Sequence, residues 1–282
     1  MNGSRFKIEQ LSEGFFEIFA NGTIHKRDPG QLDKLKNKSF TGQQSAPIGI
    51  DPLYITDGEI HLILDTGLGW GLDFGSKYKH TSNIVTNLDI FGIKPEDIHF
   101  VILSHLHYDH AAGSTFVNSD FKTTATFPNA EYLLQKREWD YAVSDHHQHS
   151  DLLGATYKMD EFYKLAAENR LHLINQDIFE LVPGIKLLFT GGHTPGHQIV
   201  QIRDEGRIIY FPGDLIPADF HLNLYAMKQM DFDPVQAKKY KTLLLKEAFN
   251  TGAFIYFYHS LFNKNGKIAR DQHKKYVLLE GS

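Results

Sequence analysis

The chain has 282 residues, of which 41% are hydrophobic, so it can bury a substantial core in one or two domains. It contains no cysteine, which excludes disulfide bonds, thiolate metal ligands and an active-site thiol nucleophile. The formal net charge is −5 without a long basic tract, which argues against nucleic acid as a partner. No apolar signal core or membrane-length run occurs, so we expect a cytoplasmic protein that does not bind a membrane.

The first 100 residues predict short strands and one helix. The clearest signal is Asp57-Gly58, a hairpin turn between two apolar runs. The predicted elements are strands at Phe15–Ala20, Leu53–Thr56 and Ile60–Leu64, and a helix at Ser82–Ile90 with Thr81 as its cap.

A cluster of metal-capable side chains follows the apolar run Phe100–Leu103, which predicts a buried strand. In an extended segment, residues i and i+2 point the same way, so His105 and His107 can share one ion. A turn that begins at Asp109 would aim Asp109 and His110 at a second ion. Imidazole and carboxylate suit zinc, and also iron or manganese. The alternative is a polar loop with solvated histidines.

The segment 114–175 interrupts this pattern. It predicts a strand at Glu131–Leu134 and helices at Lys136–Val143 and Asp160–Asn169. Three histidines lie between the two helices. They are compatible with an extra metal site, but a polar surface loop is favoured because no apolar run presents them. These are His146, His147 and His149.

Three further apolar runs lead to a possible ligand. Alone, His259 is an ordinary histidine and Asp214 a turn residue or helix cap, but the shared pattern favours ligands for both. Ile185–Phe189 and Gln198–Arg203 flank a Gly/Pro-rich turn with His193, Arg207–Phe211 leads to Asp214, and Phe254–Tyr258 leads to His259.

Asp233-Pro234 predicts the start of a helix, with a capping residue followed by proline. We expect lysines on its solvated face, namely Lys238, Lys239, Lys241 and Lys246, and inward positions at Leu243, Leu244 and Ala248. The apolar segment after Asp214 predicts either a pocket wall or ordinary core packing by Phe220, Leu222, Leu224, Tyr225 and Met227.

Together these elements resemble the metallo-β-lactamase superfamily, in its dinuclear hydrolase branch. The matching sequences are ILDTG at 63–67, HLHYDH at 105–110, GHTPGH at 192–197, GD at 213–214 and YH at 258–259. The resemblance implies an α/β (α+β) fold, an αββα sandwich of two mixed sheets with helices on the outer faces and metals along one edge. It also implies a single domain over residues 1–282, with a pocket-shaping insertion around 114–175.

The resemblance further implies a cofactor of two divalent metal ions, with Zn²⁺ expected and Fe or Mn as alternatives. One metal would be held by His105, His107 and His193, the second by Asp109, His110 and His259, and Asp214 would bridge them. His197 would be structural or would support a ligand. Asp65 would orient a ligand imidazole, or would be a plain turn aspartate.

Within the superfamily, the chain is most similar to N-acyl homoserine lactone lactonases, which are quorum-quenching enzymes. The implied reaction is attack of a metal-bridging hydroxide on a lactone or ester carbonyl, with Asp109 as the catalytic residue that moves a proton. One departure concerns a tyrosine three residues after the bridging aspartate, where this chain has Pro217. Candidates to replace it are Tyr108, Tyr225 and Tyr258.

Other functions remain open. A hydroxyacylglutathione thioester hydrolase shares this ligand set, with Lys264, Lys267 and Arg270 as candidates for binding the glutathione carboxylates. A nuclease, a mononuclear iron sulfur dioxygenase and a non-catalytic metal-binding protein are further alternatives. We expect a small-molecule substrate as the partner, and a homodimer is compatible with the sequence.

Overall fold

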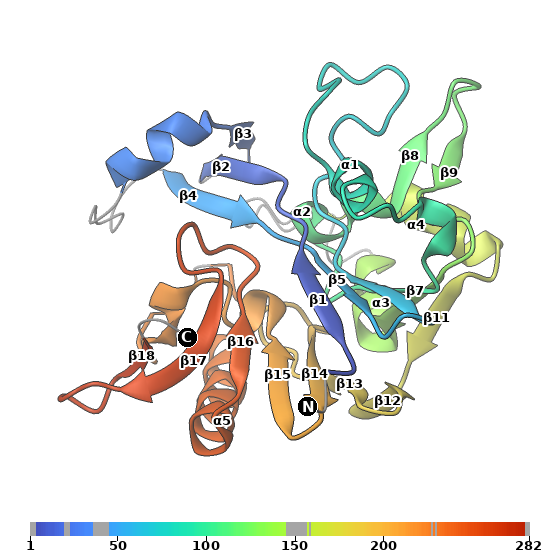
Figure 1. Cartoon of the computed structure of the whole chain (residues 1–282). Coiled ribbons are helices and arrows are strands. Elements are labelled where there is room, and N and C mark those ends of the chain that lie inside the picture. Colours follow the sequence, from blue (N-terminus) through green and yellow to red (C-terminus); the bar gives the residue numbers. More distant parts are fainter. Residues whose placement is uncertain are drawn as a thin grey trace.

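The computed structural model describes residues 4–19, 23–35, 45–144, 157, 159–226, 228 and 230–279. The predicted histidine loop at His146, His147 and His149 lies outside these residues, as does Met227. Most described strands belong to two large sheets (Figure 1). The first sheet contains, in spatial order, β1 (Lys7–Gln10), β5 (Leu53–Thr56), β6 (His61–Leu64), β7 (Phe100–Ile102), β10 (Glu131–Gln135) and β11 (Leu171–Ile174).

The second large sheet comes from the C-terminal half of the chain and is mostly antiparallel. Its one parallel pair among the described strands is β15 with β16. In spatial order its strands are β12 (Ile178–Val182), β13 (Ile185–Phe189), β14 (Gln198–Asp204), β15 (Arg207–Phe211), β16 (Phe254–Tyr256), β17 (Asn265–Arg270) and β18 (Tyr276–Leu278).

Two small antiparallel sheets lie at the periphery (Figure 1). They are formed by β3 (Ile24–Lys26), β2 (Gly14–Phe19) and β4 (Ser45–Ile50), and by β8 (Thr115–Val117) and β9 (Thr123–Ala125). The α-helices are α1 (Ile84–Asp89), α2 (Tyr108–Ala111), α3 (Lys136–Ala142), α4 (Met159–Ala167) and α5 (Pro234–Thr251). Not one of the described helices is both long and apolar enough to cross a membrane.

Three apolar clusters show how the layers pack. Between the two large sheets, alternate residues such as Leu64 and Ile102 meet Leu187 and Val200 from the opposite sheet. The other face of the first sheet packs against α1, α3 and α4, and the other face of the second packs against α5. The predicted αββα sandwich is therefore confirmed, because each sheet buries one face against its partner and the other against helices.

The predicted strands and helices are found close to their expected bounds. The hairpin at Asp57-Gly58 joins β5 to β6, and Asp233 caps α5 by accepting from the backbone N–H groups of Val235 and Gln236. The predicted cap of the first helix was wrong. The side chain that accepts from the first turn of α1 belongs to Asn83, not to Thr81.

The predicted faces of α5 were also wrong at two positions. Leu243 is 53% exposed, whereas Lys241 is buried at 3% exposure. The buried stripe runs through Ala237, Leu244 and Ala248, and Lys241 lies one turn beyond Ala237 on the same side. Its ammonium group is satisfied there by backbone carbonyl groups rather than by water.

Strand ends from both sheets converge at one edge. In the first sheet, β6 and β7 are parallel, so Asp65 and Ser104 follow neighbouring strands on the same side. In the second, β15 and β16 are parallel, so Asp214 and His259 lie beyond adjacent carboxyl ends. The backbone N–H of Gln198 donates to the Ser104 carbonyl at 2.9 Å, which joins the two edges.

Candidate metal centre

Seven predicted ligands meet at the edge where the two sheets join. They fall into three overlapping groups, and within each group the potential ligand atoms lie within 4.8 Å of one another. The groups are His105, His107 and His193; His105, His110 and Asp214; and Asp109, His110 and His259.

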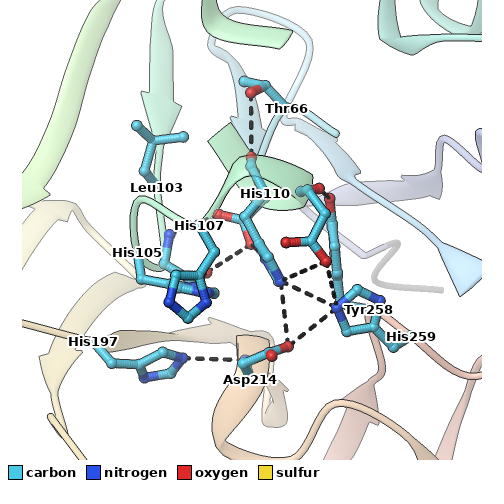
Figure 2. A network of polar contacts seen from close by, with 12 residues as sticks. Thr66, Leu103, His105, His107, His110, His197, Asp214, Tyr258 and His259 are labelled. Atoms are coloured by element: carbon cyan, nitrogen blue, oxygen red, sulfur yellow. Dashed lines mark hydrogen bonds and ion pairs between the residues drawn. The ribbon is translucent and has the colours of Figure 1, made fainter. Parts of the chain in front are cut away.

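Asp214 lies between the first and the third of these groups. Its Oδ2 is 3.2 Å from His193 Nε2, while its Oδ1 is 3.3 Å from the Nε2 atoms of both His110 and His259. Figure 2 shows the carboxylate facing His110 and His259. One carboxylate therefore turns one oxygen to each side, as a residue that bridges two ions must.

The group of three histidines has the properties of a metal site. His193 Nε2 lies 3.1 Å from His107 Nδ1, and among the described residues the buried Nε2 of His105 has no hydrogen-bond partner. Burial holds the pKa values of His105 and His193 well below their usual range and lowers that of His107 to about 4. The three rings are neutral at pH 7, which is the form that binds a metal.

The third group, formed by Asp109, His110 and His259, contains two imidazoles and a carboxylate. His259 Nε2 lies 3.4 Å from Asp109 Oδ2 and 3.2 Å from His110 Nε2. Burial disfavours charge on His110, but Asp109, Asp214 and Asp65 outweigh it and raise the pKa of His110 to about 10. Burial also opposes charge on Asp214, yet the surrounding histidines hold the pKa of this carboxyl well below its usual range. The cluster thus favours a positive charge at this position.

The histidine-rich segment has the conformation that its sequence predicts. His107 is extended, neither His105 nor His107 lies in a helix, and their ring centroids are 4.4 Å apart. Helix α2 then begins at Tyr108, so Asp109 and His110 turn toward the other group. A change from extended chain to helix within six residues divides the ligands between two sides.

Most ligand rings are held by a second contact through their other nitrogen. His259 Nδ1 contacts the Gly49 carbonyl at 2.7 Å, and His105 Nδ1 lies 2.9 Å from Ser104 Oγ. His193 Nδ1 lies 3.0 Å from Asp231 Oδ1. Such contacts fix the tautomer and the orientation of a ligand imidazole.

Asp65 contacts His110 in the same manner, at 2.8 Å from Oδ2 to Nδ1. Its Oδ1 accepts from the Ser104 backbone N–H at 2.6 Å, and the Ser104 hydroxyl donates to Oδ2 at 2.7 Å. Asp65 has a positive φ of 57°, which aspartate tolerates better than most residues. Its position supports the orienting role over that of a plain turn residue.

His197 lies beside the ligands without facing the space between them. Its Nε2 accepts from the backbone N–H of Asp214 at 3.1 Å, as Figure 2 shows, and its Nδ1 contacts Thr190 Oγ1 at 2.8 Å. Gly213, at φ +47°, would place a side chain within 3.0 Å of the same Nε2. The ring therefore supports the backbone that carries Asp214.

Sequence reasoning missed Glu138, which is fully buried and ties two ligand loops together. Its carboxylate accepts from the backbone N–H groups of Leu106 at 3.0 Å and Gly196 at 2.9 Å, and from the Tyr157 hydroxyl at 3.1 Å. A side chain at Gly196 would meet the Glu138 backbone nitrogen at 2.1 Å. Asp231 was missed as well, and the sequence around these acids holds no signal that sets them apart.

The fold is an αββα sandwich, and two groups of metal-capable side chains lie at its edge with Asp214 between them. This combination defines a class of proteins that bind two metal ions. The chain belongs to the metallo-beta-lactamase superfamily, whose family model matches residues 49–259.

Similar proteins are found by sequence and by structure. The N-acyl homoserine lactonase of Bacillus cereus is 33% identical over 129 residues, which cover 46% of this chain and 42% of the relative. The match thus spans less than half the length of that relative. A probable metal-dependent hydrolase from Staphylococcus aureus has a TM-score of 0.75, 24% identity and full coverage of both chains. AidC, a dizinc quorum-quenching lactonase, has a TM-score of 0.72 and 20% identity over 99% of this chain and 98% of its own.

Proposed function

We propose that the chain is a dinuclear metal-dependent hydrolase that cleaves a lactone or carboxylic ester. The observation that carries this proposal is Asp214, whose two oxygens face separate groups of ligands. Relatives named N-acyl homoserine lactonase support the choice of a lactone carbonyl and a quorum-quenching role. The small-molecule substrate would reach the centre at the sheet edge, where Asp214 is 9% exposed.

The donor set fits two divalent ions. His105, His107 and His193 would hold one, Asp109, His110 and His259 the other, and Asp214 both. Imidazole and carboxylate without thiolate suit Zn²⁺, with iron or manganese as alternatives. When bound, such ions acidify water near neutral pH and polarise a carbonyl group.

Asp109 is our candidate for proton transfer to the leaving oxygen. Its carboxylate is 15% exposed at the centre, and Oδ2 lies 3.4 Å from His259 Nε2. The Tyr258 hydroxyl donates to the Asp109 backbone carbonyl at 2.6 Å, and the Tyr258 ring stacks on His110 at 4.0 Å between centroids. These contacts position Asp109 so that its carboxylate can deliver a proton in a fixed direction.

The thioester alternative depends on three basic residues, and each has other contacts. The Lys264 ammonium pairs with the buried carboxylate of Asp51. Arg270 stacks on the ring of Phe249 with 4.8 Å to its centroid, and Lys267 lies 5.0 Å from the centroid of another ring. None of the three contacts a predicted ligand within the described part of the chain, so we favour a lactone or ester over a glutathione thioester.

The test combines elemental analysis with a hydrolysis screen of the metal-loaded protein. The screen contains homoserine lactones of several acyl lengths, aryl esters, a glutathione thioester and a β-lactam. We expect two metal ions per chain and turnover of a lactone or ester, both lost in His107→Ala and retained in the exposed control His273→Ala. One iron per chain with oxygen uptake, or full metal without turnover, would contradict the proposal.

A further inference from the structure

Two side chains between Asp214 and α5 have buried polar atoms without a hydrogen-bond partner. Among the described residues, Nδ1 of His221 has no such partner, and Nζ of Lys228 has only an ion pair with Asp231. An ammonium group has three N–H donors, and a buried donor without an acceptor costs about 1–3 kcal/mol, or more when it is charged. Such groups in a folded protein require an explanation, and a ligand that they bind is one.

The backbone that carries these two residues is tied down at several points. The buried Lys241 ammonium of α5 donates to the carbonyl groups of Asn223 at 2.8 Å and Ala226 at 3.0 Å. Nearer to Asp214, the His259 backbone N–H donates to the Pro217 carbonyl at 2.7 Å. Lys241 thus uses its donors to hold the segment, whereas within the described part of the chain Lys228 uses one donor for Asp231 and His221 Nδ1 has no partner. Side chains held in this way are preorganised for binding.

Lys228 lies next to a predicted ligand. Its ammonium is 3.1 Å from Asp231 Oδ1, the oxygen that also lies 3.0 Å from His193 Nδ1. Burial, followed by the Lys228 charge, holds the pKa of His193 well below its usual range. The Lys228 side chain is 14% exposed, so solvent reaches its charge only in part.

His221 interacts electrostatically with both Lys228 and Asp214. Burial and then the charges of Lys228 and Lys241 hold the pKa of His221 well below its usual range, while Asp214 acts in the opposite direction. The ring is therefore neutral and offers one N–H. The ring of Phe220 packs on it at 3.7 Å between centroids.

Three tyrosines are the other candidate donors, and each either has a hydrogen-bond partner or is exposed to solvent. The Tyr258 hydroxyl bonds to the Asp109 carbonyl, and the Tyr108 hydroxyl accepts from Trp70 Nε1 at 3.0 Å. Tyr225 is 81% exposed. Lys228 and His221 are therefore better placed as donors than these tyrosines.

We propose that Lys228 and His221 form a carboxylate-binding subsite beside the metal centre. A carboxylate fits because its two oxygens can accept from both donors and its charge compensates the ammonium. The carboxylate is either a substituent of the substrate or the group that ester hydrolysis generates. This inference rests on the proposed hydrolase function, and it names the substrate or product feature that the same site recognises.

The test uses the zinc-loaded full chain and two aryl esters, the 4-nitrophenyl monoester of glutarate and neutral 4-nitrophenyl pentanoate. Pentanoate serves as a product inhibitor. The variants are Lys228→Gln, His221→Asn and the charge-retaining Lys228→Arg, with Lys246→Gln on the exposed face of α5 as the matched control. Zinc content is measured for each.

For a substituent carboxylate, Lys228→Gln raises KM of the glutarate monoester about tenfold and leaves KM of the pentanoate ester unchanged. For a product carboxylate, it instead raises the inhibition constant of pentanoate about tenfold. His221→Asn acts in the same direction, and Lys228→Arg restores part of the effect.

The subsite is overturned if Lys228→Gln changes neither constant, or if it loses zinc, because the ammonium then only supports His193 through Asp231. If the wild type hydrolyses neither ester, the hydrolase proposal fails separately. Calorimetric titration of wild type and Lys228→Gln with glutarate still tests the subsite. The subsite requires the wild type to bind glutarate more tightly than the variant.

Discussion

His110 Nδ1 and Asp65 Oδ2 lie 2.8 Å apart, and both side chains are completely buried. The pair joins the end of β6 to the first ligand loop, because the Thr66 backbone N–H also donates to the His110 carbonyl at 2.6 Å. One imidazole is thus fixed at both its ring and its backbone. Its Nε2 is left to face Asp214 and His259.

This pairing predicts the effect of Asp65→Asn on metal affinity. The amide keeps the size of the side chain but loses the charge that orients and polarises the His110 ring. We expect the affinity for zinc to fall by about 10–100-fold, the usual effect of losing a carboxylate behind a ligand histidine. Competition with a chromogenic chelator measures this, with the exposed Asp120→Asn as control. Equal affinities for the two variants would be inconsistent with the orienting role.

Glu13 predicts a pH dependence of stability. Its carboxyl is buried beside the Leu68 backbone N–H, and burial raises its pKa from 4.5 to about 8. The folded chain therefore holds a proton that the unfolded chain releases above pH 4.5. The resulting stabilisation is complete below pH 4.5 and is lost as the pH rises through about 8, by up to about 5 kcal/mol.

Glu13→Gln should remove this slope, because the amide stays neutral at every pH. Urea unfolding at pH 5, 7 and 9 gives the free energy of unfolding for the variant, the wild type and the exposed control Glu59→Gln. We expect the variant to gain stability relative to the wild type as the pH rises. A parallel decline in all three proteins would assign the pH dependence to other groups.

Replacing the buried Lys241 should reduce stability, whereas replacing a surface lysine should not. Lys241→Met keeps most of the aliphatic stem but leaves the carbonyl groups of Asn223 and Ala226 without their donor. We expect the free energy of unfolding to fall by about 2–4 kcal/mol, against almost no change for the exposed Lys246→Met. Thermal and urea unfolding of the two variants decide this. Equal stabilities would mean that water replaces the ammonium at no cost.

The sequence predicts which side chains meet at the centre because each lies beside a strong local signal. His105 lies three residues beyond β7, and His259 lies three residues beyond β16. Parallel strands place their carboxyl ends at one edge, so separate apolar runs with similar endings predict a shared site. The hairpin at Asp57-Gly58 and the start of α5 at Pro234 are equally local, and the structure confirms both.

The supporting residues could not be predicted in this way. Asp231 and Glu138 act through contacts with residues distant in sequence. The sequence alone does not distinguish a buried acid from an exposed one. Lys241 shows the same limit, since helical spacing placed it among solvated lysines while the fold gave it carbonyl partners. Local patterns thus predict which atoms form the centre, whereas tertiary contacts decide how those atoms are held.

The central claim is that Asp214 joins two metal sites into one catalytic centre. The most direct measurement is the metal content per chain of Asp214→Asn, determined together with its hydrolysis of the best lactone or ester. We expect two ions in the wild type, at most one in the variant and hydrolysis reduced to the uncatalysed rate. A variant that retained two ions and wild-type turnover would contradict it.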